Sequence, residues 1–130
     1  MEPEWAGSEN PTRCTVPEYL LLIYSDPADA PGPDEQEADM AKWFGYTQEL
    51  ADSGSMRGGN ALEPIETATT VQVRDGETIL TDGPFAETKE ILGGYYLIDV
   101  PDLDAALAWA AKMPNIAYGK VEVRPISVFE

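Results

Sequence analysis

Short apolar runs alternate with polar segments rich in proline, glycine and aspartate along most of the chain. Glu18 to Ser25 is almost continuously apolar, which predicts a buried first strand that ends at Asp26-Pro27. From Asp34 onward, apolar residues recur three and four positions apart, which predicts a first helix that ends at Ser53-Gly54. Asp34, followed three residues later by Glu37, is its expected N-cap. The residues expected on its buried side are Met40, Trp43, Phe44, Thr47, Leu50 and Ala51.

The middle of the chain predicts three strands and a hairpin turn. Met56 to Leu62 has the pattern of a strand that Gly58-Gly59 weakens, and Thr69 to Arg74 alternates as a half-buried strand does. Asp75-Gly76 has the composition of a tight hairpin turn, which leads into a return strand from Glu77 to Thr81.

The last forty residues predict a strand, a helix and a strand. Ile91 to Val100 is the strongest strand pattern in the chain. Pro101 ends it, and Asp102 is the expected N-cap of a second helix that Pro114 ends. Its expected buried side is Leu103, Ala106, Leu107, Ala110 and Met113. Lys120 to Phe129 is the expected last strand, where the alternation changes parity at Arg124-Pro125 and so predicts a bulge or an edge crossing.

This order of elements predicts an α+β protein, a two-layer sandwich with two helices on one face of an antiparallel sheet. Large side chains occur on both faces of the central strand, since Tyr95 and Leu97 alternate with Tyr96 and Ile98. Two helices cover only one face. We therefore expect the second face to pack against the same face of a second copy, in a homodimer.

Length and charge narrow the class of protein. The chain has 130 residues, enough for one domain, which we place at residues 18–130 after an irregular N-terminal extension at residues 1–17. Its formal charge of −16 repels phosphate backbones and anionic lipid, so we expect no direct contact with nucleic acid or membrane. No apolar run has the length of a membrane span, and the acidic start lacks the pattern of a secretory signal, so the expected location is cytoplasmic.

Five segments carry a resemblance to a known family. They resemble the DGPF-domain branch of the YCII-related proteins, over about residue 18 to the end, and Asp82-Gly83-Pro84-Phe85 is the most specific of the matching motifs. The resemblance implies a ferredoxin-like fold that pairs as a dimeric α/β barrel, an arrangement shared with cofactor-free isomerases and small monooxygenases. The matching segments are Tyr19 to Tyr24, Thr67 to Val71, Asp82 to Glu90, Leu92 to Ile98 and Val121 to Pro125.

The resemblance implies no established activity. The parent YCII group has a suspected His and Asp pair, with the Asp in an Asp-Pro step after the second helix, but here that step is Met113-Pro114 and the chain has no histidine. The suspected mechanism therefore does not carry over. Members of the DGPF branch often lie beside genes for extracytoplasmic-function sigma factors, which implies a regulatory setting and makes a sigma factor a possible partner.

The missing residue types exclude much cofactor chemistry. Without histidine, and with the single cysteine Cys14, the chain lacks the ligands of zinc and haem sites, and we expect no cofactor and no metal. Gly58-Gly59 and Gly93-Gly94 lack the context of phosphate-binding loops, so close backbone packing or bulges explain them better.

One set of residues is the candidate site, with two interpretations. In the first interpretation it is a salt-bridged surface loop. In the second, Asp82 caps the loop backbone, Phe85 forms a cavity wall, and Arg124 or Lys89 holds an anionic or carbonyl group while a carboxylate accepts a proton. The weak catalytic candidates are Asp82, Glu87 and Lys89, and the ligand-binding candidates are Phe85, Arg74, Arg124 and Tyr24.

Three function classes remain open. The first is a small homodimeric accessory or ligand-binding protein, which the missing catalytic groups favour. The second is a cofactor-free isomerase or oxygenase with a carboxylate base. The third is an interaction protein whose acidic surface contacts the transcription machinery.

Overall fold

A computed structural model describes residues 18–29, 31–84 and 89–127. Strands β1, β2, β5 and β6 form the main sheet, β3 and β4 form a separate hairpin, and two long helices, α3 and α4, connect the strands of the main sheet. The elements are β1 (Glu18–Ser25), η1 (Pro33–Glu35), α3 (Gln36–Asp52), β2 (Met56–Ala61), η2 (Ile65–Thr67), β3 (Thr69–Arg74), β4 (Glu77–Asp82), β5 (Ile91–Asp99), α4 (Leu103–Ala111), η3 (Pro114–Ala117) and β6 (Gly119–Pro125).

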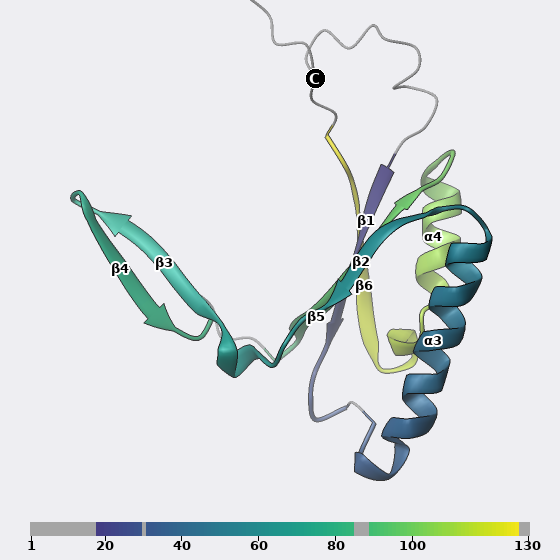
Figure 1. Ribbon diagram of the computed structural model, residues 1–130, viewed down its shortest axis with the longest axis horizontal. Helices are drawn as coiled ribbons and strands as arrows, with labels where there is room; N and C mark the ends of the chain where they lie inside the picture. Colours follow the sequence, from purple (N-terminus) through teal and green to yellow (C-terminus); the bar gives the residue numbers. More distant parts are fainter. Residues whose placement is uncertain (1–17, 30, 85–88, 128–130) are drawn as a thin grey trace, which may run out of the picture.

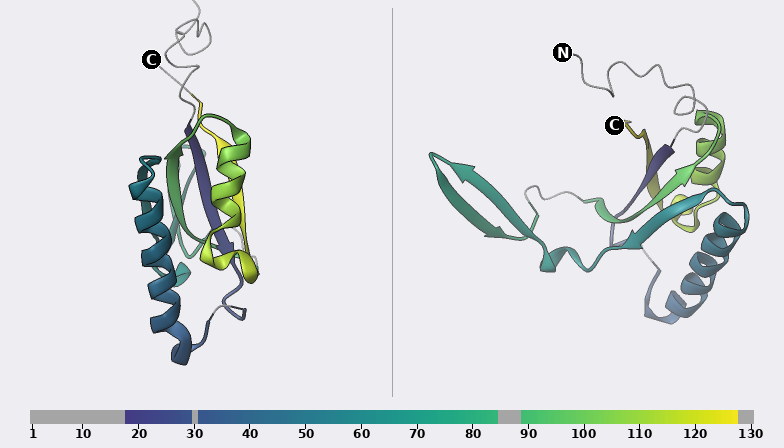
Figure 2. Two further views of the ribbon diagram at one scale, coloured as in Figure 1. Left: turned by 90° about the vertical axis from the view of Figure 1, so that its right-hand side faces the viewer. Right: turned by 45° about the horizontal axis from the view of Figure 1, so that its top comes forward.

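The main sheet is antiparallel throughout, in the order β2-β5-β1-β6. Both helices cover the same face of it, side by side (Figure 1; Figure 2, left). This is the ferredoxin-like two-layer sandwich, and the predicted fold class and order of elements are confirmed. The β3–β4 hairpin is inserted between β2 and β5.

The core lies between the helices and the sheet. Leu21 of β1 and Ile98 of β5 are fully buried against Leu50 of α3 and Ala106 of α4. Tyr46 of α3 joins the two helices, because its hydroxyl donates to the backbone oxygen of Trp109 at 2.8 Å. The core residues are Tyr19, Leu21, Tyr46, Leu50, Tyr96, Ile98, Val100, Ala106, Ala110 and Met113.

The predicted buried sides of the helices are partly wrong. Phe44 is 68% exposed and Met40 is also exposed, whereas Tyr46 takes the buried place on α3. On α4, Ala106 and Ala110 are buried as predicted, but Leu103 and Leu107 are exposed. Two helices that share one sheet face each bury a narrow stripe, so apolar residues at its margin remain in solvent.

Of the two predicted N-caps, one is confirmed and one is wrong. Asp102 caps α4 as predicted, because its Oδ1 accepts from the backbone N–H of Ala105 at 2.9 Å. Asp34 does not cap α3. Pro33 starts a 3₁₀ turn one residue earlier, so Asp34 lies inside that turn and Glu35 takes the N-cap position without a side-chain hydrogen bond.

The glycine pairs mark irregular strand pairing, as predicted. The register between β1 and β5 shifts between Ile23 and Tyr24, which leaves Gly93 as the extra residue, and β2 shifts against β5 between Met56 and Gly58. A Cβ on Gly94 would lie 2.8 Å from the backbone oxygen of Asn60. Bulges and close backbone approach therefore account for both pairs.

The last strand ends earlier than predicted. Its register with β1 is continuous from Ser25 opposite Gly119 to Tyr19 opposite Pro125. The expected parity change at Arg124-Pro125 is the end of the strand, and the predicted continuation falls partly on residues 128–130, outside the described residues. Among the described helices, none is both long and apolar enough to cross a bilayer.

The β3–β4 hairpin extends away from the helices and beyond the main sheet (Figure 1; Figure 2, right). Its turn has positive φ at Asp75 and Gly76, as the predicted tight turn requires. At its base, the N–H of Gly83 donates to the oxygen of Ala68 at 2.6 Å, and the hydroxyl of Thr70 donates to the oxygen of Gly83 at 2.7 Å. These bonds close the hairpin at the start of the Asp82-Gly83-Pro84 turn.

Candidate functional site

The sheet face opposite the helices is the candidate site, which we call the open face. Along β1 the fully buried Leu21 points to the helices, so its neighbours Leu20 and Leu22 point to the opposite side, where they are half-buried. No described helix lies on this side of the sheet, and the β3–β4 hairpin extends away from it (Figure 1). By alternation and register, the open face consists of Leu20, Leu22, Tyr24, Tyr95 and Leu97, bordered by Asn60 on β2 and by Lys120, Glu122 and Arg124 on β6.

The open face has an apolar centre and polar margins. Leu22 lies between Tyr95 of β5 and Glu122 of β6 in the register. The hydroxyl of Tyr95 accepts a hydrogen bond from the amide of Asn60 at 2.8 Å. This pairing directs one phenol oxygen and one amide toward the β2 margin and leaves hydrocarbon between the two margins.

A cation and a phenol lie together at one end of the open face. Tyr24 is directly opposite Lys120 in the register, and Lys120 forms an ion pair with Glu90, the residue before β5. Arg124 lies four residues further along β6, opposite Leu20, and forms a long ion pair with Glu122 at 3.7 Å. Two of the chain's eight basic residues therefore border this face, although the formal charge of the chain is −16.

Asn115 holds the end of the open face that carries Tyr24 and Lys120, from the helix side of the sheet. It is buried on the helix side, and its Nδ2 donates to the backbone oxygens of Tyr24 and Lys120, at 3.1 and 3.2 Å. The backbones that carry the phenol and the ammonium group are thus held by one amide. This role could not be predicted from the sequence, because an Asn after Pro114 is typical of an ordinary turn.

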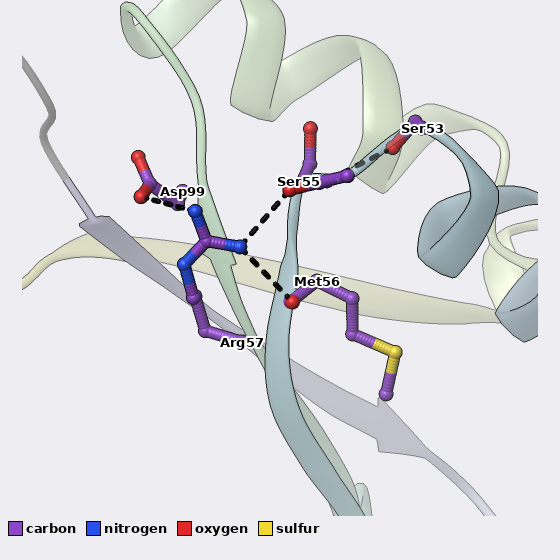
Figure 3. A network of polar contacts seen from close by, with 6 residues as sticks. Ser53, Ser55, Met56, Arg57 and Asp99 are labelled. Atoms are coloured by element: carbon purple, nitrogen blue, oxygen red, sulfur yellow. Dashed lines mark hydrogen bonds and ion pairs between the residues drawn. The ribbon is translucent and has the colours of Figure 1, made fainter.

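A second polar network holds the opposite end of the sheet (Figure 3). The guanidinium group of Arg57 donates to the carboxylate of Asp99 at 2.8 Å, to the oxygen of Gly54 at 2.9 Å and to the oxygen of Met56 at 3.3 Å. Arg57 is the extra residue of the β2 bulge. The network therefore joins the turn after α3 to the end of β5, which is a structural role.

The helix side offers a groove of about 310 Å³. The cation of Lys112 is already engaged there, since it pairs with Glu49 and lies 4.7 Å from the centre of the Trp109 ring. Burial raises the pKa of Tyr46 well above its ordinary value, and burial followed by the charge of Asp39 raises the pKa of Tyr118. The lining residues are Lys42, Gly45, Tyr46, Glu49, Lys112 and Pro114. The ammonium group of Lys120 on the open face is paired as well, so what favours the open face is its apolar centre of leucine side chains, which the lining of this groove lacks.

The structure divides the predicted site residues between two places. Tyr24 and Arg124 lie on the open face, and Lys89 is exposed just before β5. Arg74 pairs with Glu77 at the tip of the hairpin, whereas Asp82 pairs with Thr69 at its base, so the two are about 16 Å apart along the hairpin. Phe85 and Glu87 lie outside the described residues.

Within one chain, therefore, the described members of the predicted set do not form one cluster. The described residues contain no group of three or more Cys, Asp or Glu side chains arranged to hold a metal ion. The residues that sequence reasoning missed are Lys120, Asn60 and Asn115. Strand register, which a single sequence does not reveal, is what brings the first two beside Tyr24 and Tyr95.

The comparisons with known proteins identify the family. The family model described as the YCII-related domain matches residues 18–130. The chain belongs to the YCII-related family. A similar protein is an uncharacterised protein of Rhizobium meliloti (strain 1021), 37% identical over 116 residues, which cover 86% of this chain and 94% of the relative.

A solved structure similar to this YCII-related chain is 5-chloro-2-hydroxyhydroquinone dehydrochlorinase from Burkholderia phenoliruptrix AC1100, in complex with 2,5-dihydroxybenzoquinone. The sequence identity is 16%, the TM-score is 0.42, and the match covers 81% of this chain and 90% of that chain. The predicted membership of the YCII-related family is confirmed, while the DGPF branch within it stays a prediction.

Proposed function

We propose that this YCII-related protein is a homodimeric accessory protein that binds a small anionic or carbonyl compound on its open face. The composition of that face supports this most. It has a hydrocarbon centre at Leu22 and Leu97, a phenol and an ammonium group at Tyr24 and Lys120, and an amide at Asn60. An apolar surface with a few polar groups at its margins is typical of small-molecule sites.

A second copy would supply the missing wall of the site. A single sheet face contacts only one side of a ligand, whereas ligand sites bury about 70–90% of the ligand surface. Two sheets that pack face to face are separated by about 10 Å, a spacing at which a small ligand reaches both. A homodimer through the open face therefore covers the half-buried leucines and encloses the ligand at once.

The chemistry of the margins defines the compounds to test. The ammonium group of Lys120, which also pairs with Glu90, is a donor of charge-assisted hydrogen bonds to a carboxylate or a polarised carbonyl oxygen, and Tyr24, opposite Lys120 in the strand register, carries a hydroxyl as a second donor. The leucines and the Tyr95 ring suit an aromatic or short aliphatic body. Hydroxybenzoates and 2-oxo acids combine these features.

A thermal-shift screen with hydroxybenzoates and 2-oxo acids tests the proposal. A ligand at ten times its Kd adds about 1.4 kcal/mol, which raises the Tm of a domain this size by about 5 °C. Replacing Lys120 by Met removes the charge-assisted bond, and we expect it to weaken binding about tenfold. The matched control is Lys42→Met in the helix-side groove, which we expect to bind as the parent protein does.

Two results would contradict the proposal. One is that no compound of these classes raises the Tm. The other is binding that survives Lys120→Met and is lost in Lys42→Met, which would move the ligand to the helix side.

A further inference from the structure

The hairpin has one apolar side, which we call the arm face. In the β3–β4 register Val71 is opposite Leu80, and Val73 is opposite Thr78, so these side chains share one side of the hairpin. Val71, Val73 and Leu80 are 60%, 69% and 66% exposed. The arm face is therefore Val71, Val73 and Leu80, and it is in solvent.

The described part of the chain does not cover the arm face. All residues of β4 are exposed, and β3 is exposed except for Thr70. A two-stranded hairpin that stands alone is marginally stable in water, and an exposed apolar patch on such an element is typical of a contact surface. Yet the base of the hairpin is firmly closed by the Thr70–Gly83 and Ala68–Gly83 hydrogen bonds. The hairpin is thus a closed two-stranded element whose apolar side has no packing partner among the described residues.

A second copy of this chain offers the surface that fits. The open face is a half-buried apolar surface that no described helix covers, and the hairpin projects on the side away from the helices, where the open face lies (Figure 1). The charges also match. Asp82 lies on the same side of the hairpin as the arm face, two register positions from the Val71–Leu80 pair, whereas Lys120 and Arg124 border the open face.

We propose that the β3–β4 hairpin is an arm that packs its arm face against the margin of the open face of a second copy. The proposal rests on the proposed homodimer and adds the element that completes the interface. Because each copy carries both surfaces, two reciprocal contacts close a twofold dimer and leave no surface for a third copy. Each ligand site then includes residues of both copies.

This arrangement brings two of the predicted site residues, Asp82 and Arg124, close together. Within one chain Asp82 and Arg124 belong to different elements, the hairpin and β6. In the dimer the arm brings Asp82 of one copy to the β6 margin of the other, where Lys120 and Arg124, each also paired with a glutamate of its own chain, supply opposite charges.

Sedimentation equilibrium of two charge-matched variants tests the arm. The first is Val71→Lys/Leu80→Lys, on the arm face. The second is Gln72→Lys/Thr81→Lys, which adds the same two charges to the same strands on the opposite side. We expect the first to weaken dimerisation about 100-fold and the second less than about threefold, since only the first places charge in the apolar contact.

Hydrogen exchange of the amides from 69 to 82 gives an independent readout. In the parent protein their protection should rise with protein concentration, and in Val71→Lys/Leu80→Lys it should not. The substituted residues are exposed, so the far-UV spectrum of both variants should match that of the parent.

The possible outcomes separate the two proposals. A dimer that the arm-face variant does not weaken overturns the arm and leaves the homodimer intact. A parent protein that is monomeric at micromolar concentration overturns both. A monomer whose hairpin amides are protected until residues 1–17 are removed would assign the arm face to the chain's own extension, and would likewise overturn the arm.

Discussion

At the scale of single residues, Tyr46 is an ionisable side chain that folding moves from water into the core. It is buried, its hydroxyl donates to the oxygen of Trp109, and its ring meets those of Tyr96 and Trp109 edge to face, at 5.5 and 5.9 Å between centres. Burial raises the pKa of Tyr46, and the charges of Tyr96 and Glu49 raise it further. The phenol therefore stays protonated in the folded protein at a pH where the unfolded chain ionises.

This shift predicts an alkaline loss of stability. Above pH 10, the ordinary pKa of tyrosine, the unfolded chain loses the Tyr46 proton while the folded protein keeps it. Stability then falls as pH rises, by up to about 1.4 kcal/mol per pH unit from this group. Tyr46→Phe should remove that slope and, by losing the hydroxyl bond, cost about 1 kcal/mol at pH 7.

Urea unfolding from pH 7 to pH 11 measures both effects. Tyr24→Phe, on the open face, is the matched control, and it should keep the alkaline slope of the parent. Equal slopes in the parent protein and in Tyr46→Phe would show that Tyr46 does not cause the alkaline loss.

At the scale of elements, the strand pairing depends on glycine at particular positions. Gly94 pairs with Ile23 on one side and Ala61 on the other, and a Cβ there would lie 2.8 Å from the Asn60 oxygen and 3.3 Å from the Ala61 Cα. Gly93, its neighbour, is the extra residue of the bulge and has open space around it. The two residues of this Gly-Gly pair therefore differ in whether they have room for a side chain.

Alanine at each position tests this difference. Gly94→Ala should lower the free energy of unfolding by about 2 kcal/mol, because backbone has to move away from the new methyl group. Gly93→Ala should change it by less than about 0.5 kcal/mol. Denaturant unfolding of both variants measures the difference, and equal losses would mean that the β2–β5 pairing adjusts freely.

How far the sequence predicts an element depends on whether the deciding contact is local. The Asp102 cap and the Asp75-Gly76 turn were correctly predicted because each depends on backbone within a few residues. The burial of Phe44 was wrongly predicted. Periodicity shows which side of a helix is apolar, but it does not show how wide a stripe of that side is buried when two helices share one sheet face. The place of Lys120 beside Tyr24 was missed for a related reason, because it depends on a register between strands almost a hundred residues apart.

At the scale of the whole molecule, the net charge and the uncovered apolar surface have opposite effects on dimerisation. The sequence alone predicted a sheet with two apolar sides and helices for only one, and the half-buried Leu20 and Leu22 confirm the apolar second side. It did not predict that the hairpin would extend from the sheet, since no local signal sets the angle at which an inserted hairpin leaves. A dimer through these surfaces brings together two chains with a formal charge of −16 each.

This opposition predicts that salt strengthens the proposed dimer. The Debye length falls from about 30 Å at 0.01 M to about 6 Å at 0.3 M salt, so repulsion between distant acidic residues is screened while apolar contacts persist. We expect the dimer Kd to fall about tenfold over this range, as measured by sedimentation equilibrium. Glu37→Gln/Asp104→Asn, which changes two helix residues and brings the formal charge from −16 to −14, should reduce the dependence on salt. A Kd that rises with salt would contradict this balance, because it would mean that attractive pairs across the interface, such as Asp82 with Lys120, outweigh the repulsion between the two chains.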